Sequence, residues 1–495
     1  MQDFTDYSVA EQAVRDPQTP VSMLMLIAWY HPNLRTAIST HPNVDDPLLE
    51  WLKNPTPTPQ HPEPNGPGVA PRKPPPKHRI GLIIGIVAEV VALIAATILG
   101  VYLFGGYRDM PPETTEPVGT KPVGTSHSGS IEAEIYTFGG TGNDSFARVV
   151  IDSGGVIFTG GLFDGSYKDG EYSGVRKWVV IDTQGNSTIT QVDLFSPLTT
   201  LNDGRLLTTD FTVLAAVTPS GAVMWRATAM REIAGVAVAL DGSIAVVGLN
   251  QYRENIVILL NPDGTTRWTH NYGSYSDWAG AFDDVAFFGD GSLGVVSGYS
   301  ESWGMERRGA LLVNISPQGD ISSVVSLPMT SDKLTSAIAT SDGGIVAAGA
   351  AYHDSASGGT RDALIVKFSA EGEIQWTKEY GGSEYDYFLD VTVDVSGRIF
   401  VAGITESHDG DFSERPVQGI QGAYDAVIAQ LESDGSLGWA QVWAGSHYDD
   451  LWSIVVNEGR VCAVGSTNSS DGVFTGTTGN VMGTTDALVI CTTYA

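Results

Sequence analysis

The side chains that could do chemistry in this chain are scattered, and none of them is spaced as a catalytic motif. The sequence contains no nucleophile elbow, no phosphate-binding glycine loop, no HExxH and no CxxC. Its nine histidines never pair at positions i and i+4 of an expected helix, and no EF-hand spacing occurs. We therefore predict no catalytic residue, no metal site and no cofactor.

Aromatic side chains and one histidine recur in segments that we expect to be long loops. Long loops on a rigid scaffold are where recognition usually takes place, and aromatic rings can stack on sugars or anchor a protein partner. The alternative is that several of these rings only pack against their own loops. The predicted binding residues are Tyr275, Trp278, Trp303, Tyr385, Tyr387, His408 and Tyr448.

Aspartates recur at one position of a repeated segment, as Asp144, Asp277, Asp386 and Asp449. Such a carboxylate either accepts hydrogen bonds from loop amides or contributes to a catalytic ring, and we favour amide capping. The frequent Asp-Gly pairs fit tight turns that need positive φ. Turn chemistry explains these pairs, although the sequence does not decide whether acidic loops bind Ca²⁺.

The only two cysteines, Cys462 and Cys491, fall in the last repeat. We expect them nearly opposite each other on neighbouring strands, close enough for a disulfide. We also expect them outside the membrane, where the redox conditions allow one. Two inert buried thiols are the alternative.

A short phrase occurs seven times between residues 130 and 495: a turn residue, Gly and an apolar strand. The copies lie about 38 to 62 residues apart, which fits a four-stranded propeller blade with variable loops. A single blade cannot bury both of its faces, so seven copies predict a closed ring. The phrases begin at Ser153, Asn202, Leu240, Gly289, Ser341, Val395 and Asn457.

A second phrase alternates with the first: Asp-Ala, alternating apolar residues, a turn Gly and then Trp. It is clearest at 362–376 and 425–439. Together the two phrases resemble the SBBP-type bacterial β-propeller repeat, most clearly over residues 376–495. The resemblance implies a propeller fold and leaves function open, because propellers host many activities.

The last repeat ends without its fourth strand, and a matching segment lies at the other end of the domain. Residues 135–140 resemble residues 376–382 in place and type. We therefore predict that Ile131–Phe138 supplies the outer strand of the final blade and closes the ring, which protects the sheet edges.

The two faces of the expected ring differ in loop length. Hairpins joining the first to the second strand and the third to the fourth are short and share one face. The other face bears the long insertions and therefore the predicted binding residues. These insertions are Leu162–Lys177, Tyr299–Arg308, Ala351–Arg361, Ile404–Tyr424 and Ser466–Thr485.

Residues 80–104 form an apolar run long enough for one transmembrane helix. Basic residues precede it and acidic residues mostly follow it, which places the N-terminus in the cytoplasm and the ring outside the cell. Residues 55–79, with 10 prolines, predict a stiff linker. Residues 105–130 predict a flexible stalk before the propeller of residues 131–495.

Residues 1–54 read as short helices separated by prolines, expected at Val21–Trp29, Asn33–Ser39 and Pro47–Leu52. This Pro-rich spacing resembles the variant leucine-rich repeat (LRV) domain of actinobacterial membrane proteins. The resemblance implies a small α-helical cytoplasmic domain, through which a cytoplasmic protein could bind.

Charge excludes one class of partner. The chain has 27 Lys and Arg against 57 Asp and Glu, a net charge of −30 that lies mostly beyond residue 104. Such a domain repels nucleic acid. The sequence therefore favours an all-β, seven-bladed propeller on a single-pass membrane anchor, which binds an extracellular protein or glycan. The alternative is an extracellular propeller enzyme acting on a polysaccharide or cell-wall polymer.

Overall fold

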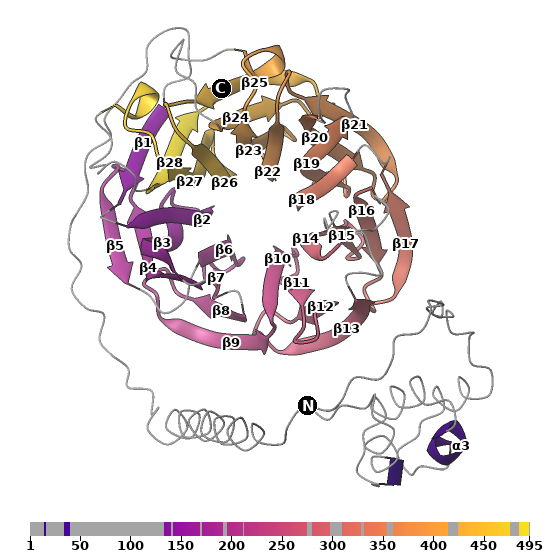
Figure 1. Cartoon of the computed structure of the whole chain (residues 1–495). Helices are drawn as coiled ribbons and strands as arrows, with labels where there is room; N and C mark the ends of the chain where they lie inside the picture. The colour runs from indigo at the N-terminus through magenta and orange to yellow at the C-terminus, as the bar shows by residue number, and fades with distance from the viewer. Residues whose placement is uncertain are drawn as a thin grey trace, which may run out of the picture. The chain divides into compact units, whose positions relative to one another are not determined.

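In a computed structural model the chain builds seven four-stranded antiparallel sheets arranged as a ring (Figure 1). The chain divides into two units, residues 1–108 and 109–495, and the ring belongs to the second. The prediction of an all-β, seven-bladed propeller is confirmed. The structure describes residues 14–15, 34–39, 133–139, 142–168, 171–191, 196–210, 212–274, 280–297, 309–327, 331–353, 360–413, 424–475 and 485–494.

Blades 1 to 6 each contain four strands consecutive in sequence, with the first strand innermost in the ring (Figure 1). Blade 1 contains β2 (Asn143–Ile151), β3 (Ile157–Lys168), β4 (Glu171–Ile181) and β5 (Ser187–Gln191). Blade 2 contains β6 (Ser196–Thr200), β7 (Leu206–Thr209), β8 (Val213–Val217) and β9 (Val223–Ala229). Blade 3 contains β10 (Glu232–Val238), β11 (Ile244–Leu249), β12 (Glu254–Leu260) and β13 (Thr266–Ser274).

The later blades follow the same plan. Blade 4 contains β14 (Phe282–Phe287), β15 (Leu293–Ser297), β16 (Leu311–Ile315) and β17 (Ile321–Ser326). Blade 5 contains β18 (Ser331–Ala339), β19 (Ile345–His353), β20 (Thr360–Phe368) and β21 (Ile374–Tyr380). Blade 6 contains β22 (Asp386–Val393), β23 (Ile399–Thr405), β24 (Asp425–Leu431) and β25 (Leu437–Trp443). Blade 7 contains β26 (Asp449–Asn457), β27 (Arg460–Thr467), β28 (Asp486–Thr493) and β1 (Ala133–Phe138).

The hairpins from first to second and from third to fourth strand form what we term the short-turn face. Their glycines take the left-handed conformation that the repeated phrase requires, as at Gly242 (φ 83°) and Gly291 (φ 85°). The opposite end of each blade, where second strands meet third strands and blades join, is termed the long-loop face.

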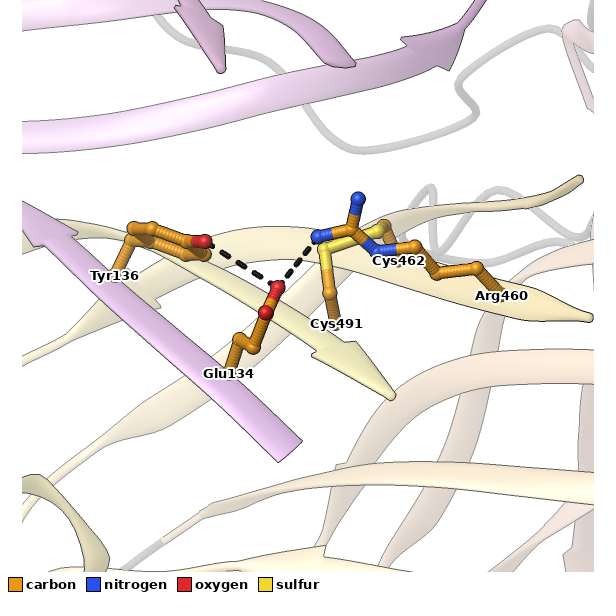
Figure 2. Close-up of a disulfide and its surroundings, with 5 residues drawn as sticks. All are labelled: Glu134, Tyr136, Arg460, Cys462 and Cys491. Carbon is orange, nitrogen blue, oxygen red and sulfur yellow. Dashed lines mark hydrogen bonds and ion pairs between the residues drawn. A yellow bond between two sulfur atoms is a disulfide. The ribbon is translucent and has the colours of Figure 1, made fainter. Parts of the chain in front are cut away.

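Strand β1 closes the ring. It pairs antiparallel with β28 along its whole length, from Ala133 opposite Thr492 to Phe138 opposite Ala487. Figure 2 shows how it is tied to blade 7: the Glu134 carboxylate accepts hydrogen bonds from Tyr136 (3.3 Å) and Arg460 (2.5 Å). The predicted closing strand is therefore confirmed.

A disulfide joins Cys462 and Cys491, which lie directly opposite each other on β27 and β28 (Figure 2). Both residues are fully buried among the apolar side chains between blades 7 and 1. The bond cross-links two strands of the blade that also holds the closing strand. Because it joins residues 29 apart in sequence, it restricts the unfolded chain as well.

The innermost strand of every blade contains a β-bulge, which was not predicted from the sequence. In each strand the pairing register skips one residue at the bulge, and six of these seven residues lie on the wall of a central cavity. The registers of β2 and β18 shift a second time near the start of the strand. A bulge redirects the side chain that it releases from the ladder. The seven bulged residues are Ala147, Leu198, Ala234, Asp283, Thr335, Leu389 and Trp452.

Two predicted loops are strand at least in part. In Ala351–Arg361, Tyr352 pairs with Arg361 and His353 with Thr360 across β19 and β20. Within Leu162–Lys177, strands β3 and β4 continue as a paired ribbon, with Phe163 opposite Val175 and Tyr167 opposite Tyr172. The segment contains the β-formers Phe163, Tyr167, Tyr172 and Val175, so its described residues extend the two strands instead of forming an irregular loop. The segment Leu162–Lys177 still lies at the long-loop face, as predicted.

The N-terminal predictions fall mostly outside the described residues. Within the expected helix Asn33–Ser39 the structure has α3 (Arg35–Ile38), flanked by the buried Leu34. The other two expected helices, both linkers and the apolar run 80–104 lie outside the described part of the chain. Among the residues that the structure does describe, no helix is long and apolar enough to cross a membrane.

Candidate functional site

Four of the predicted binding residues are described, and all four lie at the long-loop face of blades 6 and 7. Tyr385 and Tyr387 flank the start of β22, His408 follows β23, and Tyr448 precedes β26. His408 is exposed, and 53% of the surface of Tyr448 is accessible. The remaining three, Tyr275, Trp278 and Trp303, lie outside the described residues.

Arg361 brings aromatic rings from two blades together. Its guanidinium carbon lies 5.5 Å from the ring centroid of Tyr352, 5.8 Å from that of Tyr385 and 5.9 Å from that of Tyr387. These are cation–π distances. A β-bridge between Arg361 and Tyr385 also links blade 5 to the loop that enters blade 6. Tyr352 and Arg361 are not among the predicted binding residues, because they lie at the ends of an expected loop.

The same arrangement recurs one blade further on. Tyr424 takes the place of Arg361, and its ring lies 5.5 Å from that of Tyr448. Burial, followed by the hydrogen bond and charge of Glu406, raises the pKa of Tyr424 to about 12. Burial likewise raises the pKa of Glu406. We term Tyr352, Arg361, Tyr385, Tyr387, Tyr424 and Tyr448 the aromatic ridge; it runs over the long-loop face of blades 5 to 7.

Buried aspartates fix the loops that carry this ridge. Asp386 accepts hydrogen bonds from the Gly382 amide (3.0 Å), the Ser407 hydroxyl (2.7 Å) and the Thr405 hydroxyl. Burial, partly offset by these hydrogen bonds, raises the pKa of Asp386 to about 6. The predicted role of Asp386 in capping loop amides is thereby confirmed.

Asp449 repeats this network in blade 7. It accepts from the Gly445 amide (2.9 Å), the Ser469 hydroxyl (3.0 Å) and the Thr467 hydroxyl. Burial raises its pKa to about 7. The hydroxyl donors belong to a sequence pattern, Thr-x-Ser-x-Asp-Gly-x-Phe, present at 405–412 and 467–474. This pattern was the overlooked signal for the caps.

This sequence pattern does not recur at the seam between blades 7 and 1. Asp144 and Asp486 are both buried there, and Phe163 lies nearby among the apolar residues. Burial and the neighbouring charge of Asp144 raise the pKa of Asp486 to about 6. The recurring aspartate is therefore buried in a seam in all three cases that the structure describes. Asp277 lies outside the described residues.

The ring encloses a central cavity of about 450 Å³. Two ion pairs each contribute a cation to its wall. Lys333 pairs with Asp283 (3.2 Å) and Arg148 pairs with Asp390 (3.8 Å). A residue next to a bulge also forms a hydrogen bond between blades. The Asp284 carboxylate in blade 4 accepts it from the Ala337 amide in blade 5 (3.0 Å). Burial raises the pKa of Asp284 to about 6.

A histidine and two carboxylates meet at the long-loop end of blade 5. Nε2 of His353 lies 3.3 Å from the Asp362 carboxylate and 3.1 Å from that of Glu379. The three residues come from the adjacent strands β19, β20 and β21. Burial, reinforced by the charges of Glu379 and Asp411 and opposed by that of His353, raises the pKa of Asp362.

A comparison with protein-family models gives a match over a short part of the chain. The family model for the Leucine Rich Repeat Variant domain matches residues 8–63, in agreement with the resemblance of the N-terminal segment to that domain. No curated protein matches the chain.

Three solved structures similar to this chain have 8 to 13% sequence identity to it. A protein of unknown function from Bacteroides caccae has 13% identity and a TM-score of 0.37, covering 54% of this chain and 89% of its own. The Pan2 WD40 domain of Neurospora crassa has 8% identity and a TM-score of 0.43, covering 71% and 90%. XC5397, a gluconolactonase from Xanthomonas campestris, has 10% identity and a TM-score of 0.35, covering 78% and 100%.

Proposed function

We propose that this chain is a membrane-anchored cell-surface protein whose extracellular propeller binds a polysaccharide through the aromatic ridge. Residues 80–104 are the proposed single span, with the N-terminal domain in the cytoplasm and the SBBP-like propeller outside. The observation that carries the binding proposal is the continuity of the ridge. Aromatic rings from three successive blades lie on one face, on loops fixed by buried caps.

The chemistry of the ridge fits a sugar polymer better than an apolar partner. Tyrosines present flat apolar faces together with hydroxyl groups. Carboxylates stand beside them, including the exposed Glu384 and the partly buried Glu406, and carboxylate oxygens accept hydrogen bonds from sugar hydroxyls. A protein partner anchored on the same rings is the alternative occupant. The acidic surface disfavours anionic polymers among the candidates.

Binding can be tested on the purified chain with a glycan array and with solubilised cell-wall polysaccharide. We expect Tyr385→Ala and Tyr448→Ala each to weaken binding by roughly 1 kcal/mol or more, about tenfold, at an unchanged melting temperature. Val395→Ala is the matched control, because Val395 is fully exposed in a turn of the short-turn face. Loss of binding in the control variant, with both tyrosine variants intact, would reverse the assignment.

The membrane anchor needs a separate test. Alkaline phosphatase is active only outside the cytoplasm, so a fusion after residue 130 should be active and a fusion after residue 54 inactive. Activity in the opposite pattern contradicts the proposed topology.

The central cavity supports the alternative function, an enzyme acting on a polysaccharide. Its wall combines Lys333 and Arg148 with the carboxylate of Asp283. If the protein cleaves the polymer that it binds, Asp283→Asn should abolish cleavage and leave affinity at the ridge unchanged. Binding without any cleavage favours the binding module.

A further inference from the structure

The contacts between His353 and its two acidic neighbours have ion-pair distances without the geometry of hydrogen bonds. Nε2 of His353 is shielded from solvent and forms no hydrogen bond. The carboxylate oxygens of Asp362 and Glu379 nevertheless lie 3.3 and 3.1 Å away. Both oxygens therefore lie off the axis along which Nε2 would donate or accept.

This arrangement matches neighbouring ligands around a metal ion. In a tetrahedral shell with imidazole and carboxylate ligands about 2.0–2.2 Å from the metal, a nitrogen and an oxygen are about 3.3 Å apart. The nitrogen points at the metal, so the oxygens lie beside its axis. The three ligand atoms of His353, Asp362 and Glu379 lie within 4.8 Å of one another, close enough to share one ion.

Strand register makes the cluster a consequence of the fold. His353 pairs with Thr360, Asp362 with Ala351, and Glu379 with Leu364. Side chains two positions apart share a face of a sheet, so these pairings place all three ligands on the same face of blade 5. The neighbouring Arg361 alternates to the other face, where it contacts the tyrosines of the ridge.

The surrounding charge favours a cation. Asp411 adds a third carboxylate, whose charge acts on Asp362 together with that of Glu379. The side chains of His353, Asp362 and Glu379 are 38%, 26% and 36% exposed, so water or a ligand can reach the cluster. Three protein ligands with an accessible fourth position are typical of zinc sites that bind a further group.

We propose that His353, Asp362 and Glu379 bind one divalent first-row metal ion, for which Zn²⁺ is the best match. An imidazole nitrogen favours Zn²⁺ over Mg²⁺ and Ca²⁺, which prefer oxygen ligands only and in larger number. The remaining coordination position faces solvent at the long-loop end of blade 5. The site is independent of the proposed function, because it uses none of the ridge side chains.

The test is calorimetric titration of the chelator-treated, full-length chain with Zn²⁺. The expected result is one ion per chain. We expect His353→Ala to weaken affinity by at least about 100-fold, and the isosteric Glu379→Gln by at least about tenfold. His447→Ala is the matched control, since it removes an exposed histidine of the long-loop face in blade 7 and should leave affinity unchanged. Zn²⁺ should also raise the melting temperature of the parent chain and not that of His353→Ala.

Two results would overturn the proposal: no binding at millimolar Zn²⁺, or binding that His353→Ala leaves intact. Ca²⁺ binding more tightly than Zn²⁺ would contradict the proposed class of metal. Glu379→Gln keeps the shape of the side chain and guards against a folding defect in the alanine variant. Because metal stoichiometry is read without any polysaccharide, a failed glycan assay does not affect this result.

Discussion

Aspartates lie at both ends of the blades, in opposite environments. At the short-turn face, Asp290 is exposed and accepts hydrogen bonds from the Ser292 amide (2.9 Å) and hydroxyl (2.6 Å), which lower its pKa. At the long-loop face, Asp449 is buried in a seam and accepts from three donors, yet burial raises its pKa to about 7. Nearby Asp425 adds a like charge that raises it further.

The difference shows that hydrogen-bond count alone does not set the state of a carboxylate. In an exposed turn the charge remains hydrated, so two donors suffice to favour the ionised form. In a seam, loss of water outweighs three donors. One end of the ring therefore contains ordinary turn residues, and the other end contains costly buried groups that fix the loops beneath the ridge.

The largest effect should follow removal of a seam carboxylate. Asp449→Ala leaves the Gly445 amide and the hydroxyls of Thr467 and Ser469 without their acceptor in a buried site. We expect a loss of about 3 kcal/mol or more in the free energy of unfolding, measured by chemical denaturation. A loss below about 1 kcal/mol would mean that the cap is dispensable and that water replaces it.

The pH dependence of stability should have opposite signs at the two ends. Asp449, Asp386 and Asp486, with pKa values of about 7, 6 and 6, keep their protons to higher pH than an unfolded aspartate does. Between about pH 4 and 7 the folded chain therefore binds more protons than the unfolded chain, and stability falls as pH rises.

Turn aspartates have lowered pKa values, so their contribution to stability rises as pH rises. For Asp342, burial opposes the shift, but hydrogen bonds from Lys367 and Thr340 lower the pKa to about 2. Its contribution is fully present above about pH 4 and is lost as pH falls toward 2. We expect the melting temperature to peak near pH 4–5 and to drop by pH 7.5, with a smaller drop in Asp449→Asn. A melting temperature that rises steadily up to pH 7.5 would contradict the seam assignment.

The smallest effect should come from the turn. Asp290→Ala removes two exposed hydrogen bonds and should cost less than about 1 kcal/mol in the same denaturation assay. The comparison of the two ends depends on the difference between the losses in free energy of unfolding of Asp290→Ala and Asp449→Ala. Equal losses for Asp290→Ala and Asp449→Ala would show that burial does not distinguish the two ends.

The repeated phrases were enough to predict the blade count and the closing strand, because each phrase encodes a turn and a strand within about ten residues. The bulges were missed, although their signal is visible. Phe146 and Val149 are both buried and lie three positions apart, which a regular strand would place on opposite faces. The same spacing separates Phe388 from Val391.

The site was harder to predict than the fold. His353, Asp362 and Glu379 are separated by turns and loops of unrelated length, and only the register of three strands brings them together. No motif spacing could show this. Arg361 was missed for a similar reason, since its aromatic partners come from β19 and from the next blade. The sequence did place Tyr385, Tyr387, His408 and Tyr448 on one face, because that inference needed only loop lengths.

Closure by β1 also sets an order of events during synthesis. The ribosome makes β1 before every other strand of the ring, and its partner β28 after all the others. Until β28 emerges, β1 has an unpaired edge and six blades have no seventh neighbour. During synthesis, β1 therefore stays unpaired until β28 has been made. A product that lacks β28 would expose the unpaired strand edge of β1, with which other chains could aggregate. Quality control in the cell should thus be most demanding while β28 is being made.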